Sequence, residues 1–192
     1  MPPKAKFTKE EIVAAALEIV RTSGADALTA RSLGEKLGSS ARPIFTIFNG
    51  MDEVQNEVIA SARSLYEKYE DESMQCSNPF KGSGIGYIRF AAEQPKLFQL
   101  LFMRERFDIP DRGTVLSLID NYYETILQAV QTEYGFDAVV SKKIYLNMWI
   151  YSHGIASLIA TNVCEFSEEV ISEMLTDVCT SIIRKYKAEE RE

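Results

Sequence analysis

The sequence predicts an all-α protein of about nine helices, and three observations support this prediction. Apolar residues recur every three or four positions over most of the chain, which is the spacing of one helix face. Capping residues and glycines stand where these segments would begin and end. All six prolines lie within the first 110 residues, so residues 111–192 can form long helices. No run alternates apolar and polar residues between turns, as a strand would.

The composition is that of a globular protein with one or two domains. The chain has 192 residues, of which 46% are hydrophobic and 26% are charged. No apolar run approaches the roughly 18 residues needed to cross a bilayer. The N-terminal MPPKAKFTKEE lacks the apolar core of a signal peptide. We therefore expect a cytoplasmic protein without membrane contact, whose three widely spaced cysteines are reduced thiols.

The first helix is expected from about Thr8 to Thr22. Thr8 and Glu11 have the spacing of a capping box, in which each side chain accepts a hydrogen bond from the other residue's backbone N–H. Gly24 would end the helix. The apolar spacing predicts a buried face of Ile12, Ala16, Ile19 and Val20.

Residues 29–48 read as two short helices joined by a glycine turn, which is the helix-turn-helix arrangement. Thr29 is a good N-cap, and Gly38 can adopt the left-handed conformation that closes the first of these helices. Ser39 or Ser40 can cap the second helix. In a helix-turn-helix protein, this second helix enters the DNA major groove.

If Ser40 is the N-cap, Pro43 falls in the first turn, where its missing N–H costs nothing. Arg42 would point outward, and arginine is the side chain best suited to a bidentate contact with guanine. An ordinary helical hairpin with a solvated arginine has the same pattern. In both interpretations the outward residues are Ser39, Arg42 and Thr46, and the core residues are Ile44, Ile47 and Phe48.

Six more helices complete the expected fold. Asp52 can cap a long helix that ends near Ser73 and buries Val54, Val58, Ala62 and Leu65. A linker, CSNPFKGSG (76–84), would precede a helix over residues 85–93, and Pro95 would open the next, to about Arg106. After the loop 107–113, the pattern predicts helices over residues 114–134, 137–161 and 167–187. Gly135 ends the first of these, and Asp137 and Ser167 can cap the other two.

The net charge of −7 is unevenly distributed. Residues 1–50 carry seven lysines and arginines and five acidic residues, a net of +2, which leaves −9 for the rest of the chain. A mildly basic N-terminal region, residues 1–50, on an otherwise acidic chain permits DNA contact that is confined to this region.

The order of motifs over residues 7–58 resembles the DNA-binding domain of the TetR family of bacterial transcriptional regulators. The motifs are ALTARSLGEKLG, then S-x-x-x-I-F-x-x-F, then D-E-V. Further on, YIRFAAEQPKLFQLLFM (87–103) resembles a segment of that family's ligand-binding half, and MWIYSHG (148–154) resembles its Trp-His-Gly signature. The resemblance implies a helix-turn-helix DNA-binding domain (1–50) and a helical-bundle domain for ligand binding and dimerisation (51–192).

The resemblance further implies a dimeric, ligand-responsive regulator, most often a repressor, that binds a palindromic DNA operator. The expected DNA contacts are Lys4, Lys6, Thr29, Arg31, Ser39, Ser40, Ala41, Arg42, Pro43, Phe45 and Thr46. For Arg31, a solvated surface charge is the competing interpretation, and for Lys4 and Lys6 a disordered tail.

Three departures from the family pattern lower the expected affinity for the DNA backbone. Phe45 stands where the family usually has a tyrosine that contacts a phosphate, and Ile47 stands where a histidine is common. Met51 replaces a lysine that usually meets the DNA backbone. Each change removes a positioning contact rather than a base contact. These departures motivate an alternative function: a small-molecule-binding helical bundle whose N-terminal domain has lost specific DNA binding.

The resemblance also implies a pocket for a small hydrophobic or aromatic ligand among the aromatic residues of the second half. The candidates are Phe90, Phe98, Phe102, Tyr122, Tyr123, Tyr145, Trp149 and His153. The competing interpretation is an ordinary bundle core with a hydrogen-bonded structural histidine.

The last two helices are candidates for a dimer interface. Their apolar residues recur at helical spacing: Ile155, Ile159, Ile171, Met174, Leu175, Val178 and Ile182. In the family, two such helices from each subunit form a four-helix interface, and the alternative is burial within one chain. A homodimer would place two recognition helices in successive major grooves, about 34–36 Å apart.

Enzyme chemistry finds little support in the sequence. His153 is the single histidine, whereas a di-iron bundle needs two Glu-x-x-His motifs. The glycine-rich GSGIG (82–86) follows no strand and lacks the lysine of a phosphate-binding loop. We therefore expect no enzymatic activity, no metal and no cofactor.

Overall fold

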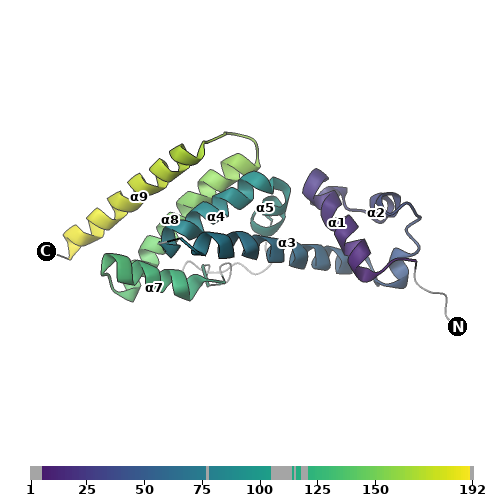
Figure 1. Cartoon of the computed structure of the whole chain (residues 1–192), viewed down its shortest axis with the longest axis horizontal. Coiled ribbons are helices and arrows are strands. Elements are labelled where there is room, and N and C mark those ends of the chain that lie inside the picture. Colours follow the sequence, from purple (N-terminus) through teal and green to yellow (C-terminus); the bar gives the residue numbers. More distant parts are fainter. Residues whose placement is uncertain (1–5, 77, 105–113, 115, 118–120, 191–192) are drawn as a thin grey trace. The chain divides into compact units, whose positions relative to one another are not determined.

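The computed structural model describes residues 6–76, 78–104, 114, 116–117 and 121–190, and over these residues the chain is all-α, as predicted. Every regular element in the described ranges is helical (Figure 1). Eight α-helices and two short 3₁₀ helices are found there, in place of the nine or so helices expected. They are α1 (Lys9–Ser23), η1 (Ala25–Ala27), α2 (Ala30–Lys36), η2 (Ile44–Thr46), α3 (Met51–Met74), α4 (Pro79–Glu93), α5 (Pro95–Phe102), α7 (Tyr123–Tyr134), α8 (Ala138–Ala160) and α9 (Glu168–Glu189).

The described residues form two compact units, and α3 contributes to both. The first unit contains the residues up to Glu67 together with Gln94–Arg104. The second contains Lys68–Glu93 and the described residues beyond Arg104. The units divide within α3, whereas the predicted domain boundary lies at residue 50.

In the first unit, α1 packs against α2, η1 and α5. The capping box of α1 is present as predicted, because Thr8 and Glu11 each accept a hydrogen bond from the other's backbone N–H. Gly24 follows the helix with a φ of 88°, which only glycine adopts without strain. The buried residues of the unit include Ile12, Ala16, Val20, Leu28, Leu33, Ile44, Phe48, Val54, Val58, Ala62, Leu97 and Phe98.

The expected α-helix over residues 41–48 is absent, and a 3₁₀ helix of three residues, η2, lies there instead. The expected serine cap is absent too: Pro43 precedes η2, and no side chain caps it. The backbone still winds helically, through hydrogen bonds from Ile44 to Ala41, from Thr46 to Pro43 and from Ile47 to Ile44. These are i→i−3 bonds, which wind the chain more tightly than an α-helix does.

Three expected details of the following helices are corrected. Asp52 lies within the first turn of α3 and not before it, and Glu53 instead accepts hydrogen bonds from the backbone and side chain of Asn49. Leu65 is half-buried, and its neighbour Tyr66 takes the core position at 4% exposure. Helix α5 ends at Phe102, earlier than the predicted end near Arg106.

In the second unit, α4, α7 and α8 pack against one another, and α9 packs on α8 and α4 (Figure 1). Asp137 and Ser167 cap α8 and α9 as predicted, and Gly135 ends α7 in the left-handed conformation. The predicted start of α7 near Thr114 lies partly outside the described residues. Over the described residues, no helix is both long and apolar enough to cross a membrane.

The expected linker over residues 76–84 is wrong, because α4 begins at Pro79 and the GSG sequence is helical. A β-carbon on Gly82 would overlap the carbonyl oxygen of Ser73, and one on Gly86 would overlap the Ser73 side chain. The glycines therefore let α4 pass against the end of α3. This close approach overrides the usual helix-weakening effect of glycine.

Candidate nucleic-acid interface

The turn between α2 and η2 is held by local hydrogen bonds and by one close backbone approach. Thr29 caps α2, and its partner in the cap is Ser32. Gly38 has a φ of 62°, as predicted, and Ser39 N–H donates to the carbonyl of Gly34 at 2.9 Å. An ideal β-carbon on Gly34 would lie 3.0 Å from the backbone nitrogen of Ala41. A side chain at position 34 would therefore push the turn away from α2.

Residues 41–48, which we call the recognition segment, expose one face and bury the other. Ile44 and Phe48 are buried, at 0% and 2% exposure. Arg42, Phe45 and Thr46 are exposed, and Phe45 reaches 46%. Arg42 lies before the 3₁₀ helix and Phe45 lies within it, and both side chains are exposed. Arg42 and Thr46 are exposed, as predicted. Ile47, predicted to be buried in the core, is half-buried.

The hydroxyl of Thr46 is less available than the sequence suggests. Its Oγ1 donates to the carbonyl oxygen of Pro43 at 2.6 Å. Threonine then has no second O–H to donate to a base. What it still offers outward is its methyl group and the lone pairs of the oxygen.

The N-terminal arm meets the recognition segment through one side chain. Lys6 Nζ donates to Ser39 Oγ at 3.0 Å, so the ammonium group lies at the turn that leads into residues 41–48. Its charge also lies 5.2 Å from the centre of the Phe7 ring. Lys4 lies outside the described residues.

Among the remaining predicted DNA contacts, two side chains bond to other groups of the protein. Arg31 is 90% exposed at its side chain and pairs with Glu35 at 2.9 Å, which favours the surface-charge interpretation for the free protein. The hydroxyl of Thr29 is committed to the cap. Ser40 is exposed, and Ala41 and Pro43 are half-buried.

The predicted ligand residues are divided between the two units. Phe98 and Phe102 belong to the first unit, where their ring centres lie 5.2 Å apart and Phe102 packs edge-on against Tyr66. The other six belong to the second unit. The apolar pattern identified buried faces, but it carried no information on which faces meet.

Within the second unit, His153 is the centre of one aromatic cluster. Its ring stacks on Trp149, with centres 5.4 Å apart, and its Nδ1 shares a 2.8 Å hydrogen bond with the hydroxyl of Tyr87. Burial lowers the pKa of His153 below its usual value of 6.5. The imidazole is therefore neutral at physiological pH, as the structural interpretation expects.

A second cluster lies around Tyr145. Tyr145 stacks on Tyr123 and packs edge-on against Phe80, with ring centres 5.9 and 6.1 Å apart. Tyr122 donates a hydrogen bond to Asp71. Phe90 is fully buried and packs edge-on against Tyr69. The contacts of Phe90 and Tyr145 are those of a packed core, whereas the hydrogen bond of Tyr122 lies at the surface.

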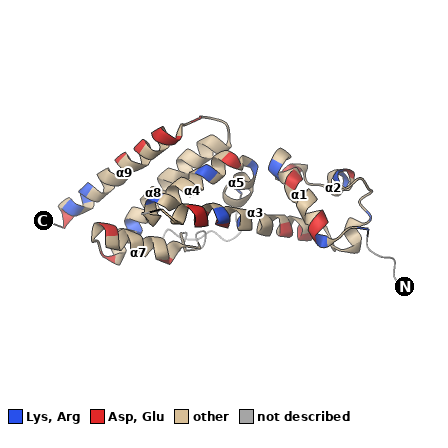
Figure 2. Cartoon of the chain, viewed as in Figure 1, with Lys and Arg blue, Asp and Glu red and all other residues tan. Residues whose placement is uncertain are grey.

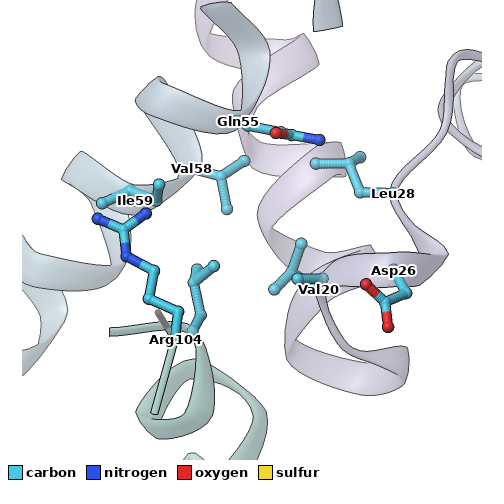
Figure 3. Close-up of a pocket in the computed structure, with 9 residues that line it drawn as sticks. Val20, Asp26, Leu28, Gln55, Val58, Ile59 and Arg104 are labelled. Carbon is cyan, nitrogen blue, oxygen red and sulfur yellow. The ribbon is translucent and has the colours of Figure 1, made fainter. Parts of the chain in front are cut away.

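A pocket of about 280 Å³ lies in the first unit, among residues that the sequence analysis did not select. Figure 3 shows Val20, Leu28 and Val58 along its wall, with Asp26 and Arg104 at opposite sides. Val20 belongs to α1, Asp26 to η1 and Val58 to α3. Leu28 follows η1, and Arg104 follows α5. No local motif marks them, because the pocket forms only where distant segments meet.

The predicted dimer residues are partly used within the chain. Ile155 and Leu175 are buried, at 3% and 6% exposure, and the other five are half-buried. The sequence analysis missed four exposed apolar residues on the same two helices: Val139 at 63%, Ile150 at 55%, Leu158 at 40% and Val170 at 41%. Figure 2 shows that α9 carries acidic residues near its start and basic residues near its end.

Comparison of the chain with models of known protein families gives no match, and comparison with curated protein sequences gives none either. In the described part of the chain, no group of three or more histidine, cysteine or acidic side chains is arranged to hold a metal ion. Evidence for a function therefore comes from the residues and geometry of the recognition segment.

Proposed function

We propose that this protein is a sequence-specific DNA-binding transcriptional regulator of the helix-turn-helix type that acts as a homodimer. The observation that carries the proposal is the two-faced recognition segment. Ile44 and Phe48 anchor it in the first unit, while Arg42 and Phe45 face outward. A buried anchor with an exposed arginine is what a base-reading element needs, because its register is fixed by the protein core.

Each exposed group has a distinct task in this proposal. Arg42 donates two hydrogen bonds to guanine in the major groove. Lys6, held at the turn by Ser39, supplies a cation for a neighbouring phosphate. Backbone and phosphate contacts set the position of the segment, and base contacts set the sequence that is bound.

The surfaces of α8 and α9 support dimerisation. Covering their exposed apolar residues, Val139, Ile150, Leu158 and Val170, with a partner would be favourable. In α9, the acidic start includes Glu168, Glu169 and Glu173, and the basic end includes Arg184, Lys185 and Lys187. Two copies of α9 paired antiparallel about a two-fold axis would bring each acidic half beside the partner's basic half. Such symmetry matches a palindromic operator.

Regulation by a small hydrophobic or aromatic ligand is part of the proposal, on the strength of the sequence resemblance. A ligand that binds better to a conformer with wrongly spaced recognition segments would release DNA, and linkage makes the effect reciprocal. A coupling of about 1–3 kcal/mol would change the DNA affinity roughly 5–150-fold. Repression is the expected output.

Selection of bound duplexes from a random DNA pool tests the proposal. We expect the full-length protein to enrich an inverted repeat whose half-sites are one helical turn apart, about 34–36 Å. The Arg42→Ala variant should enrich no such repeat. Arg21→Ala is the matched control, because it removes the same charge from α1, where Arg21 pairs with Glu18. If the wild type enriches nothing, the proposal is wrong.

One observation favours the alternative, a helical protein whose N-terminal domain no longer binds specific DNA. The recognition segment contains three residues of 3₁₀ helix rather than two turns of α-helix. This alternative predicts that wild type and Arg42→Ala bind any duplex equally. It fails if Arg42→Ala abolishes sequence preference while the circular dichroism spectrum and melting temperature stay unchanged.

A further inference from the structure

Phe45 is an aromatic side chain at a position where the recognition segment would otherwise be polar. Its neighbour Ile44 is fully buried, whereas Phe45 is 46% exposed. Arg42, three residues earlier in the same segment, is exposed as well. The surface offered to a partner therefore combines one cation with one apolar ring.

Thr46 adds to the apolar character of this face. Its hydroxyl hydrogen is committed to the carbonyl of Pro43 at 2.6 Å, so the methyl group and the oxygen lone pairs are what it can offer to a new contact. Arg42 is then the strong hydrogen-bond donor of the segment.

The chemistry of the major groove limits what such a face can recognise. The base edges there offer hydrogen-bond donors and acceptors and one apolar group, the C5-methyl of thymine. A phenyl ring placed against a polar base edge would desolvate that edge without replacing its hydrogen bonds. The same ring against a methyl group buries apolar area from both sides.

We propose that Phe45 is a specificity-determining residue that contacts a thymine methyl, beside a guanine bound by Arg42. The proposal rests on the proposed DNA-binding function and names the bases that function would select.

The test replaces thymine by deoxyuridine, one position at a time, in the duplex enriched from the random pool. Deoxyuridine keeps the base pair and removes the methyl group alone. The full-length wild type should lose about fourfold in affinity at one thymine in each half-site, the loss expected for one methyl-sized apolar contact. Fluorescence anisotropy of the labelled duplex measures the change.

Two variants show whether Phe45 is responsible. In Phe45→Ala, the thymine and deoxyuridine duplexes should bind equally, and because the ring is half-exposed the fold should persist, as a melting curve checks. In Arg42→Ala, which should lose the sequence preference, the affinity for both duplexes should fall. The proposal is overturned if no thymine shows an effect in the wild type, or if Phe45→Ala retains it.

The proposed DNA binding and the proposed thymine contact of Phe45 can be distinguished when one of them is wrong. If the pool yields an enriched duplex that is insensitive to every deoxyuridine, the protein reads DNA but Phe45 does not read thymine. If the pool yields no enriched duplex, the DNA-binding function fails, and the role of Phe45 fails with it.

Discussion

Gly34 of α2 and Ala41 of the recognition segment approach so closely that an ideal β-carbon on Gly34 would lie 3.0 Å from the Ala41 nitrogen. The same β-carbon would lie 3.0 Å from the carbonyl carbon of Ser40. Backbone atoms cannot rotate away as a side-chain end can. This contact therefore sets where the exposed side chains of Arg42 and Phe45 lie on the first unit.

Gly34→Ala should lower the free energy of unfolding by about 1–3 kcal/mol, the usual effect of overpacking. It should also weaken DNA binding, because the recognition segment must move. Gly50→Ala is the control, since nothing lies within 4 Å of a β-carbon there. Urea denaturation of both variants checks the prediction, which is wrong if the two behave alike.

Thr29 gives a way to separate capping from DNA contact. Thr29→Ala removes the hydroxyl that accepts from Ser32 N–H at 3.1 Å, and should cost about 1 kcal/mol of stability. Thr29→Asn keeps a capping oxygen and should lose much less. If Thr29 also contacts DNA, both variants should bind the selected duplex more weakly at equal folded fraction. Thermal melting and anisotropy supply the two measurements.

In the second unit, the close approach of α4 to α3 makes Gly82 a sensitive position. Gly82→Ala would force its methyl onto the carbonyl oxygen of Ser73 and to 2.7 Å from Cys76 Sγ. We expect a loss of about 1–3 kcal/mol or more in the free energy of unfolding.

Gly154→Ala is the matched control for Gly82, because it lies inside α8 with nothing within 4 Å of a β-carbon. It should raise the free energy of unfolding by up to about 1 kcal/mol, the difference in helix propensity between the two residues. Both variants are measured at equal protein concentration. A free energy of unfolding that falls in Gly82→Ala and rises in Gly154→Ala supports the packing explanation. A loss at both positions would contradict it.

The pH dependence of stability should carry a contribution from His153. Burial lowers the folded-state pKa of His153 below 6.5, so below that pH the unfolded chain takes up a proton that the folded protein resists. The free energy of unfolding should therefore fall as pH drops from 6.5 towards the folded-state pKa, and this contribution should be constant above 6.5. His153→Gln should remove it.

Because the chain has one histidine, a proton NMR titration follows His153 without ambiguity. The expected midpoint lies below pH 6.5. A midpoint at or above 6.5 would mean that the imidazole is not desolvated by its contacts with Trp149 and Tyr87.

Sequence reasoning succeeded where structure is decided locally. The Thr8–Glu11 capping box, the Asp137 and Ser167 caps and the left-handed Gly38 each depend on a few neighbouring residues, and all are present. Helical spacing likewise identified core residues such as Val54 and Val58. Such features need no knowledge of the tertiary fold.

Sequence reasoning failed where a contact between two distant segments determines the local structure. The recognition segment is 3₁₀ rather than α-helical, and its contact with Gly34 is invisible in the local pattern. The GSG sequence is helical because Gly82 meets Ser73, although glycine alone favours a linker. The placement of Phe98 and Tyr145 in different units is a further example.

The affinity ratio between two duplexes tests the central claim most directly. One duplex is the sequence enriched by the wild-type protein, and the other has the same bases in scrambled order, both measured at one fixed salt concentration because phosphate contacts depend on salt. The account predicts that the selected duplex binds at least about a thousandfold more tightly. Equal affinities for the two duplexes would contradict it.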